Sequence, residues 1–248
     1  MTTATNYVIL GAAGGIGAAT VRRLRSQDAN VLLAGRTEAS LAKLSQEVGS
    51  PYRVVDATNL TQVDALLRES ADLMQSVDGV VNCVGSLLLK PAHLTTDHEW
   101  QETMALNLTT AFATVHGAVK VMRQSGGAIV LISSAAAELG LPNHEAIAAA
   151  KAGVNGLVRA AAASYASRGI RVNSVAPGLV RTNMTHKIWS TTKAAESSRG
   201  MHALGRLGEP DDVASLICWL LDPANNWITG QTIGIDGGLG SVRTSAKS

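Results

Sequence analysis

The sequence predicts a single α/β domain in which a doubly wound parallel sheet is covered by helices on both faces. Short apolar runs rich in β-branched residues alternate with longer amphipathic runs along the whole chain, and this alternation is typical of parallel sheets with helical crossovers. Hydrophobic residues make up 46% of the chain but aromatic residues only 3%. Small aliphatic side chains therefore fill the core, which suits closely packed layers of helix and parallel sheet.

Short length, β-branched residues and flanking Gly or Pro mark the predicted strands, and amphipathic patterns mark the helices. The predicted strands are 7–10, 31–34, 52–55, 77–82, 128–133, 171–176 and 232–236. The predicted helices are 16–26, 38–48, 60–70, 99–123, 143–167 and 211–221. Together they predict a seven-stranded parallel sheet with right-handed crossovers.

The chain shows no linker and no internal repeat. We expect residues 1–240 to form one domain and the polar residues 241–248 to form a flexible tail. Segment 181–206 has no predicted strand and mixes Met184 and Trp189 with polar residues. A segment of this length inside a compact domain is usually functional or mobile. We expect a lid over the substrate, with a surface excursion as the alternative.

Composition excludes several classes of function. The net charge is +2 and the basic residues are scattered, so nucleic acid is not an expected partner. Cys83 and Cys218 stand in different contexts, and neither a metal site nor a disulfide framework is expected. No charge-free apolar run reaches about 18 residues, and a short polar start leads directly into the first strand. We expect a cytoplasmic enzyme with no membrane span and no signal peptide.

A glycine-rich turn follows the first predicted strand and opens the first helix. It spans 11–17 and contains Gly11, Gly15, Ile16 and Gly17. Glycines permit the tight turn and let backbone N–H groups approach a pyrophosphate, which then rests on the helix N-terminus. The turn predicts a Rossmann-type dinucleotide site.

The end of the second predicted strand distinguishes the two nicotinamide dinucleotides. NAD(H) sites usually place an acid there for the ribose 2′-hydroxyl, whereas this chain reads Ala34-Gly35-Arg36-Thr37. The planar guanidinium of Arg36 can pair with a 2′-phosphate. The sequence therefore favours NADP(H) over NAD(H), the alternative being that Arg36 merely faces solvent.

Further motifs recur in a fixed order along the chain. They are Asp56 after the third strand, Asn82-Cys-Val-Gly85 after the fourth, Asn107 in Leu-Asn-Leu-Thr, Ser134 after the fifth strand, Lys151, Pro177-Gly178 followed by Thr182, the segment 206–210, and Gly230-Gln-Thr with Asp236-Gly-Gly. With these motifs the chain resembles the short-chain dehydrogenase/reductase family over essentially its whole length, although Leu10 replaces the threonine that usually precedes the glycine turn.

The resemblance implies roles for these residues. For the cofactor, Asp56 would contact the adenine and Lys151 would hold the nicotinamide ribose. The nicotinamide amide would be held by Pro177, Gly178 and Thr182, and the cofactor would lie beside Asn82 and Gly85. For the substrate, Ser134 would polarise the reacting group, and Asn107 would support the region of Lys151. The resemblance also implies a homotetramer, or a homodimer. The alanine-rich helix 143–167 fits such an assembly, because small side chains let helices pack closely.

The family's catalytic tyrosine has no counterpart in this chain. Ile147 stands four residues before Lys151, on the same helical face, where the resemblance places the tyrosine. A carbonyl that accepts hydride must be protonated, and a positioned acid contributes about 10²–10⁴-fold to such a step. Isoleucine cannot supply that proton.

Three explanations remain open. His144, two turns before Lys151 on nearly the same face, is a candidate acid because histidine titrates near neutrality, although it could equally face water. Alternatively, the proton comes from water, or the substrate arrives protonated. Finally, the chain could be an inactive NADP(H)-binding sensor, scaffold or partner subunit. We expect an NADP(H)-dependent oxidoreductase that transfers hydride to or from a small, largely apolar carbonyl, imine or activated alkene.

Overall fold

A seven-stranded, all-parallel sheet forms the centre of the molecule in a computed structural model that describes residues 4–242. The strand order is β3-β2-β1-β4-β5-β6-β7, which confirms the predicted fold. The strands are β1 (Asn6–Leu10), β2 (Asn30–Gly35), β3 (Tyr52–Val54), β4 (Gly79–Asn82), β5 (Gly127–Ile132), β6 (Ile170–Pro177) and β7 (Thr232–Ile235). The order reverses direction between β1 and β4, and ligands of such sheets bind outside the carboxyl ends of the strands at this point.

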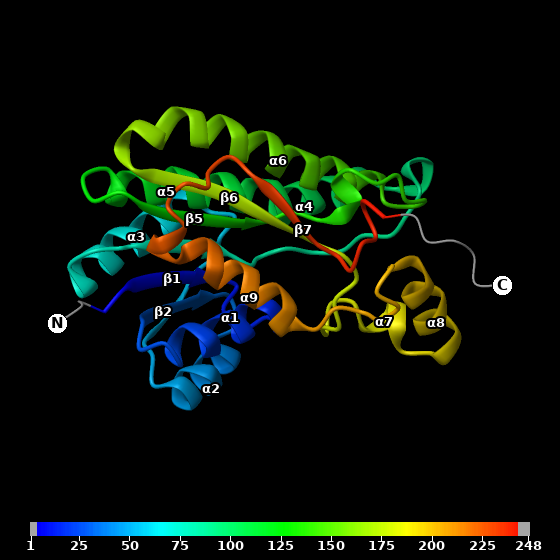
Figure 1. Cartoon of the computed structure of the whole chain (residues 1–248), viewed down its shortest axis with the longest axis horizontal. Helices are drawn as coiled ribbons and strands as arrows, with labels where there is room; N and C mark the ends of the chain where they lie inside the picture. Colours follow the sequence, from blue (N-terminus) through cyan, green and yellow to red (C-terminus); the bar gives the residue numbers. More distant parts are fainter. Residues whose placement is uncertain (1–3, 243–248) are drawn as a thin grey trace.

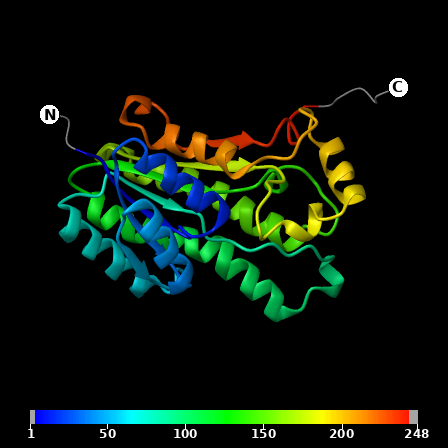
Figure 2. The ribbon, with the colours of Figure 1, turned by 90° about the horizontal axis from the view of Figure 1, so that it is seen from below.

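Helices cover both faces of the sheet (Figures 1 and 2). Their bounds are α1 (Gly15–Arg25), α2 (Glu38–Val48), α3 (Leu60–Met74), α4 (Asp97–Met104), α5 (Thr110–Met122), α6 (Glu145–Tyr165), α7 (His186–Trp189), α8 (Thr192–Met201) and α9 (Pro210–Leu221). Short 3-10 turns occupy Ala92–Leu94, Ala135–Ala137, Ala166–Arg168 and Pro223–Asn225.

Alternation along β1 shows how the two cores form. Val8 and Leu10 pack into the core beneath α3, α5 and α6. Tyr7 and Ile9 face the other way, into the core beneath α1, α2 and α9. Successive side chains of a strand point to opposite faces, so a strand covered on both sides reads as a continuous apolar run.

Two predicted helices differ from the observed ones for local reasons. The predicted helix 99–123 is continuous in the chain but contains a π-helical segment, Ala105–Thr109, between α4 and α5. Such segments occur frequently at functional sites. The predicted helix 143–167 begins only at Glu145, because Asn143 has a φ of 64°, which no right-handed helix accommodates.

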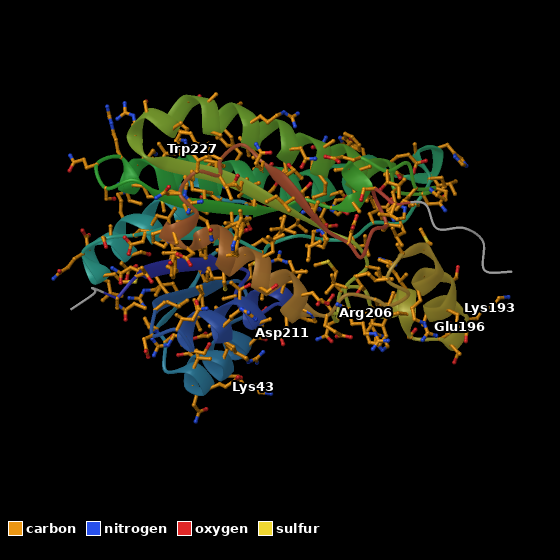
Figure 3. The ribbon with its side chains drawn as sticks, viewed as in Figure 1. Lys43, Lys193, Glu196, Arg206, Asp211 and Trp227 are labelled. Atoms are coloured by element: carbon orange, nitrogen blue, oxygen red, sulfur yellow. The ribbon has the colours of Figure 1, made fainter. Side chains whose placement is uncertain are left out.

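Segment 181–206 contains no strand, as predicted, but it holds the helices α7 and α8, which the sequence analysis missed. Thr191 caps α8 by accepting a hydrogen bond from the N–H of Ala194 at 3.3 Å. Lys193 and Glu196 project from α8 into solvent, far from Trp227 (Figure 3). A short helix with a narrow apolar face gives little periodicity, so its pattern resembled a loop.

The described residues end within the predicted tail. Of the predicted tail 241–248, residues 243–248 lie outside the described residues. None of the helices between residues 4 and 242 has the length and apolarity needed to cross a membrane. Within the same residues no group of three His, Cys, Asp or Glu side chains could hold a metal ion.

Candidate cofactor cleft and active site

The glycine turn after β1 is shaped so that only hydrogen fits at several positions. Gly11 has a φ of 72°, and a Cβ there would lie 2.8 Å from the carbonyl carbon of Cys83. A Cβ on Gly17 would overlap the carbonyl oxygen of Gly11. Gly14 precedes α1 and offers no side chain to cap it, so the first N–H groups of the helix remain available. This cradle fits the pyrophosphate of a dinucleotide.

The turn forms one side of a cleft of about 250 Å³. The other sides come from the ends of β2, β3 and β4 and from Met184 of segment 181–206. Of the predicted cofactor residues, the cleft is lined by Gly11, Arg36, Asp56 and Gly85. Gly15, Ile16 and Gly17 lie beside it in the first turn of α1. The structure thus brings together predicted residues from four separate strand ends.

Charge and hydrogen bonding at the ends of β2 and β3 set the polarity of the outer part of the cleft. Arg36 is exposed at the end of β2, and Thr37 begins α2 without using its hydroxyl as a cap. Asp56 accepts hydrogen bonds from the N–H and hydroxyl of Thr58, at 3.0 and 2.8 Å. These bonds, with a smaller contribution from Arg36, lower the pKa of the Asp56 carboxyl. The site therefore presents an ionised acid near a free guanidinium.

The turn after β4 connects the cleft to the buried polar groups behind it. The Asn82 side chain, 3% exposed, accepts a hydrogen bond from the N–H of Val84 at 2.8 Å. Gly85 follows, and a Cβ there would lie 3.0 Å from Oδ1 of Asn107 and 3.7 Å from Nζ of Lys151. Gly85 thus lines the cleft, and the space that a Cβ would take there is bordered by two of the predicted catalytic residues.

Asn107 lies in the π-helical segment, and three hydrogen bonds hold its side chain. Its Oδ1 accepts from the N–H of Ser86 at 3.2 Å, and its Nδ2 donates to Oγ of Ser86 and to the carbonyl of Thr103, both at 3.0 Å. The side chain therefore fixes the loop after β4. Ser86 was missed by sequence reasoning, because its only signal was its place one residue after Gly85.

Lys151 is the buried cation of the site. Its side chain comes from α6, is 6% exposed, and donates from Nζ to the carbonyl oxygen of Ile132 at 2.8 Å. Burial lowers the pKa of this ammonium group from 10.5 to about 8. The described residues place no carboxylate in an ion pair with Lys151, so its charge is available to a ligand.

Two neighbouring serines after β5 have different roles. Ser134 caps the turn Ala135–Ala137, where its Oγ accepts from the N–H of Ala136 at 3.1 Å, and it is partly exposed. Ser133 is buried and donates from Oγ to Oδ1 of Asn155 at 2.6 Å. Ser133 and Asn155, which the sequence analysis did not single out, tie α6 to β5 and so fix the helix that carries Lys151.

The start of α6 places Ile147 and His144 in different surroundings. Ile147 is 3% exposed and lies one turn before Lys151. His144 is the residue that precedes the helix, and its Nδ1 lies 2.8 Å from the carbonyl oxygen of Pro142. Since a carbonyl can only accept, Nδ1 carries a hydrogen and the neutral ring offers an acceptor at Nε2.

The loop after β6 reaches the glycine turn from the other side. Pro177 ends β6 and Gly178 follows it. Oγ1 of Thr182 lies 3.1 Å from Oγ1 of Thr185, which also accepts from the N–H of Thr182 at 3.1 Å. The methyl group of Thr182 lies 2.8 Å from the position of a Cβ on Gly15. Thr185, missed by the sequence analysis, therefore positions the predicted nicotinamide residue.

Comparison with known proteins identifies what this arrangement is similar to. Residues 11–240 match the family model described as Enoyl-(Acyl carrier protein) reductase. The 3-oxoacyl-[acyl-carrier-protein] reductase FabG of Thermotoga maritima is 35% identical over 242 residues, which cover 94% of this chain and 96% of that protein. The 3beta-hydroxysteroid dehydrogenase 1 of Eggerthella lenta is 32% identical over 240 residues, which cover 94% and 92%.

Solved structures agree with this assignment. A short-chain type dehydrogenase/reductase from Mycobacterium ulcerans has a TM-score of 0.91 at 29% identity, covering 95% of this chain and 89% of that one. ElxO with NADP bound has a TM-score of 0.90 at 28% identity, covering 96% and 99%. The family match spans nearly the whole chain, and the relatives are oxidoreductases. The chain belongs to the short-chain dehydrogenase/reductase family of oxidoreductases.

Proposed function

We propose that this protein is an NADP(H)-dependent oxidoreductase that transfers hydride to or from a small, largely apolar carbonyl, imine or activated alkene. The observation that carries the proposal is the position of Gly85, which lines the nucleotide cleft and lacks a Cβ that would come close to the Asn107 and Lys151 side chains. A dinucleotide in the cleft would extend towards these two residues. The NADP-bound structure of ElxO supports the choice of cofactor class.

Arg36 is the reason for proposing NADP(H) rather than NAD(H). It is exposed at the mouth of the cleft, and a planar guanidinium suits a phosphate better than a hydroxyl. The N-terminus of α2, one residue further on, adds a favourable partial charge for an anion. The proposed cofactor supplies or accepts the hydride. The chain's own groups bind and orient it.

Each remaining residue has a role in the proposal. The cofactor residues are those of the glycine turn (Gly11, Gly15, Ile16, Gly17), the strand ends (Arg36, Asp56, Asn82, Gly85), Lys151 for the ribose, and the loop after β6 (Pro177, Gly178, Thr182). Ser134, partly exposed after β5, would polarise the substrate. Asn107 would support the region of Lys151, while its hydrogen bonds to Ser86 hold the loop after β4.

Proton delivery distinguishes this active site from that of the family. Ile147 takes the position that the resemblance assigns to a tyrosine, and it is a buried hydrocarbon. His144 could donate from Nε2 only as an imidazolium, since Nδ1 already contacts Pro142. The other source is water, or a substrate such as an iminium that needs no proton on transfer. Hydride transfer then depends mainly on positioning.

A second candidate function follows from the same isoleucine. A buried hydrocarbon beside Lys151 favours a protein that binds NADP(H) without turnover, as a sensor, scaffold or partner subunit. The combination of Ser134, Asn107 and Lys151 argues for catalysis, because a scaffold has no need of this set of polar groups in one pocket.

We further propose a homotetramer, or a homodimer, in the cytoplasm. Support comes from the outward face of α6, which exposes Ala152, Ala160 and Ala163, and from Gly156, where an added Cβ would meet nothing within 4 Å. Small exposed side chains let a second helix approach closely. Size-exclusion chromatography with light scattering should give a mass of two or four chains, and a monomer at micromolar concentration would refute the proposal.

Binding and turnover are tested separately. Calorimetry should show NADPH binding more tightly than NADH, and the reverse order would overturn the assignment of Arg36. Carbonyls, imines and activated alkenes are then screened for NADPH oxidation with wild type and His144→Ala. Turnover that disappears in His144→Ala while NADPH binding is intact identifies the histidine as the acid. NADPH binding without turnover of any class supports the sensor.

A further inference from the structure

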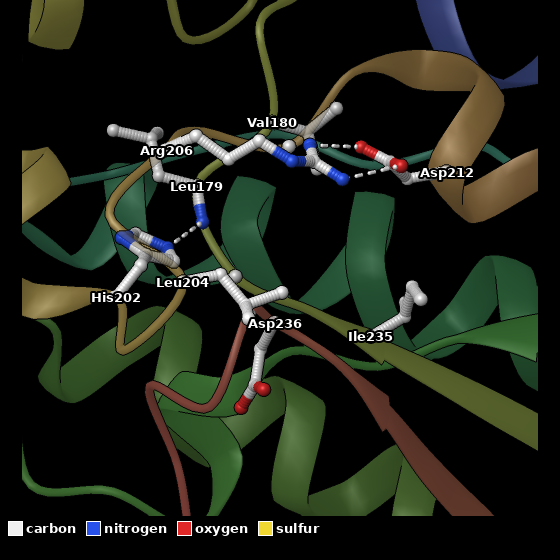
Figure 4. A pocket seen from close by; sticks show the side chains of 11 residues that line it. Leu179, Val180, His202, Leu204, Arg206, Asp212, Ile235 and Asp236 are labelled. Carbon is white, nitrogen blue, oxygen red and sulfur yellow. Dashed lines mark hydrogen bonds and ion pairs between the residues drawn. The ribbon is translucent and has the colours of Figure 1, made fainter. Parts of the chain in front are cut away.

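His202 lies where three segments of the chain meet, outside the cofactor cleft. It follows the last turn of α8, faces the loop after β6, and packs against the turn after β7. Its side chain is 4% exposed and helps to line a cavity of about 70 Å³ (Figure 4).

Both ring nitrogens of His202 are occupied. Nε2 accepts a hydrogen bond from the backbone N–H of Leu179 at 3.1 Å, and Nδ1 lies 2.8 Å from the carbonyl oxygen of Ser198 in α8. An N–H only donates and a carbonyl only accepts. The neutral ring with its hydrogen on Nδ1 is therefore the only form that satisfies both partners.

The backbone is shaped to admit this ring. A Cβ on Gly178 would lie 2.7 Å from Nε2 of His202, so the close approach of the imidazole requires glycine there. Gly237, at the turn after β7, would place a Cβ 3.5 Å from Cβ of His202. The imidazole thus fills a space between the ends of β6 and β7 and joins both to α8.

This contact bears on the cofactor cleft through a short stretch of chain. Leu179 lies three residues before Thr182, whose methyl group faces Gly15 of the glycine turn. Leu179 also accepts from the N–H of Gly208 at 2.9 Å, which fixes the other side of the loop. The hydrogen bond from Leu179 to His202 therefore links the position of α8 to the position of Thr182.

The charged groups around His202 are engaged elsewhere. Arg206 and Asp212, which line the same cavity, pair with each other at 2.6 and 2.8 Å. Asp236 accepts from the N–H groups of Gly238 and Gly240, and its carboxylate points away from the imidazole (Figure 4). Nearby ion pairs join Arg199 to Glu196 and Arg181 to Glu209. Among the residues the structure describes, none of these carboxylates hydrogen-bonds the ring.

We propose that neutral His202 is a positioning residue that holds α8 against the loop bearing Thr182, and that protonation of its ring releases α8. An imidazolium carries hydrogens on both nitrogens, so its Nε2–H would face the N–H of Leu179 and the bond between them would be lost. Histidine is the side chain that titrates between about pH 5 and 8. The release itself is independent of the proposed function, whereas its effect on NADP(H) affinity rests on that function.

Amide hydrogen exchange of the cofactor-free protein tests the release. Peptides that cover 177–206 are followed at about pH 7.5 and 5.5, with correction for the intrinsic exchange rate, in wild type, His202→Gln, His202→Leu and the control His186→Gln. His186 is an exposed histidine of the same segment. An unpaired buried donor changes an opening equilibrium by about 5- to 150-fold.

In wild type and His186→Gln, the amides of these peptides should exchange faster at the lower pH, by about 5- to 150-fold. A glutamine oxygen accepts from Leu179 at either pH, so His202→Gln should exchange slowly at both. His202→Leu should exchange fast at both. A wild-type pH response that persists in His202→Gln, or that disappears in His186→Gln, would overturn the proposal. If His202→Leu does not fold, the pH dependence of amide exchange in His202→Gln decides: equal rates at both pH values support the proposal, and faster exchange at the lower pH contradicts it.

NADPH affinity provides the second readout. The dissociation constant of the wild type should rise at the lower pH by more than that of His202→Gln, and equal rises in the two proteins would contradict the coupling to Thr182. If NADPH binds to none of the proteins, the proposed function fails, while the exchange profiles still decide the role of His202.

Discussion

The proposed nucleotide cleft and the proposed catalytic pocket of this protein are built from different parts of the chain. The cleft relies on backbone groups and on glycines whose missing side chains leave room for a ligand, as at Gly11 and Gly17. The pocket relies on buried side chains, of which Lys151 and Asn107 are polar and Ile147 is not. Binding determinants made of backbone persist through many side-chain changes, whereas one substitution can remove a proton donor.

The difference implies that cofactor binding and proton delivery can be separated in this protein. Lys151 and Ile147 lie one turn apart on α6, so a change at one position leaves the backbone of the other in place. Substitutions in the pocket, at the lysine shared by both regions and in the cleft should therefore have different effects.

Ile147→Tyr should have the largest effect. A phenol beside Lys151 would supply the missing acid, and we expect ketone reduction to rise by about 10²–10⁴-fold. Ile147 is buried, so the larger ring also costs about 1–3 kcal/mol of stability. Steady-state NADPH oxidation with ketones measures the gain. Ile147→Phe adds the same ring without the hydroxyl, and equal rates in the two variants would show that an acid is not what the pocket lacks.

Lys151→Met should change how stability depends on pH. In the unfolded chain this lysine keeps its proton up to about pH 10.4, whereas burial lowers its native pKa to about 8. Between these values the unfolded state binds more protons, so the ammonium group's contribution to stability rises with pH. Relative to Lys151→Met, the cofactor-free wild type should gain about 3 kcal/mol across this interval.

Chemical denaturation at several pH values measures that difference. Burial also raises the pKa of Cys83 to about 12 and that of Cys218 to about 11, which lowers stability above about pH 9. The comparison between the two proteins cancels the contribution of Cys218. The contribution of Cys83 differs between them, because the charge of Lys151 lowers the pKa of this thiol. Lys43→Met removes an exposed lysine as the control and should follow the wild type. A Lys151→Met profile parallel to that of the wild type would refute the lowered pKa.

Arg36→Ala should have the smallest effect, confined to one cofactor. Loss of a charge-assisted contact with the 2′-phosphate should weaken NADPH binding by about 5- to 150-fold and leave NADH binding unchanged. Calorimetry with both dinucleotides measures the change. Arg68→Ala, an exposed arginine on α3, is the control. An equal loss for both cofactors would mean that Arg36 stabilises the cleft rather than recognising the phosphate.

The strands and the cleft could be predicted because their signals are local. The apolar runs gave all the strands of the sheet to within two residues, and the glycine turn lay where strand and helix patterns meet. The helix 143–167 began too early because the left-handed conformation of Asn143 leaves no periodic signal. Short amphipathic segments such as α7 and α8 were missed because a few residues cannot establish a helical period.

Several contacts of the site could not be predicted, because they join residues distant in sequence. Asn107 binds Ser86 across 21 residues, and His202 binds Leu179 across 23. Neither pair has a spacing that identifies it. Local pattern reveals which elements form, but it does not reveal which loops they bring together.

By itself, the sequence determined the alternating α/β architecture, the glycine cradle, the guanidinium at the end of the second strand, and an isoleucine one turn before a lysine. Only the tertiary structure decided that Lys151 is buried against a carbonyl oxygen and has a lowered pKa, that Gly85 leaves room beside Asn107, and that His202 joins α8 to the loop of Thr182. The physical reason is that burial and partnership are properties of three-dimensional packing, and these set the charge and position of a side chain whose type the sequence alone supplies.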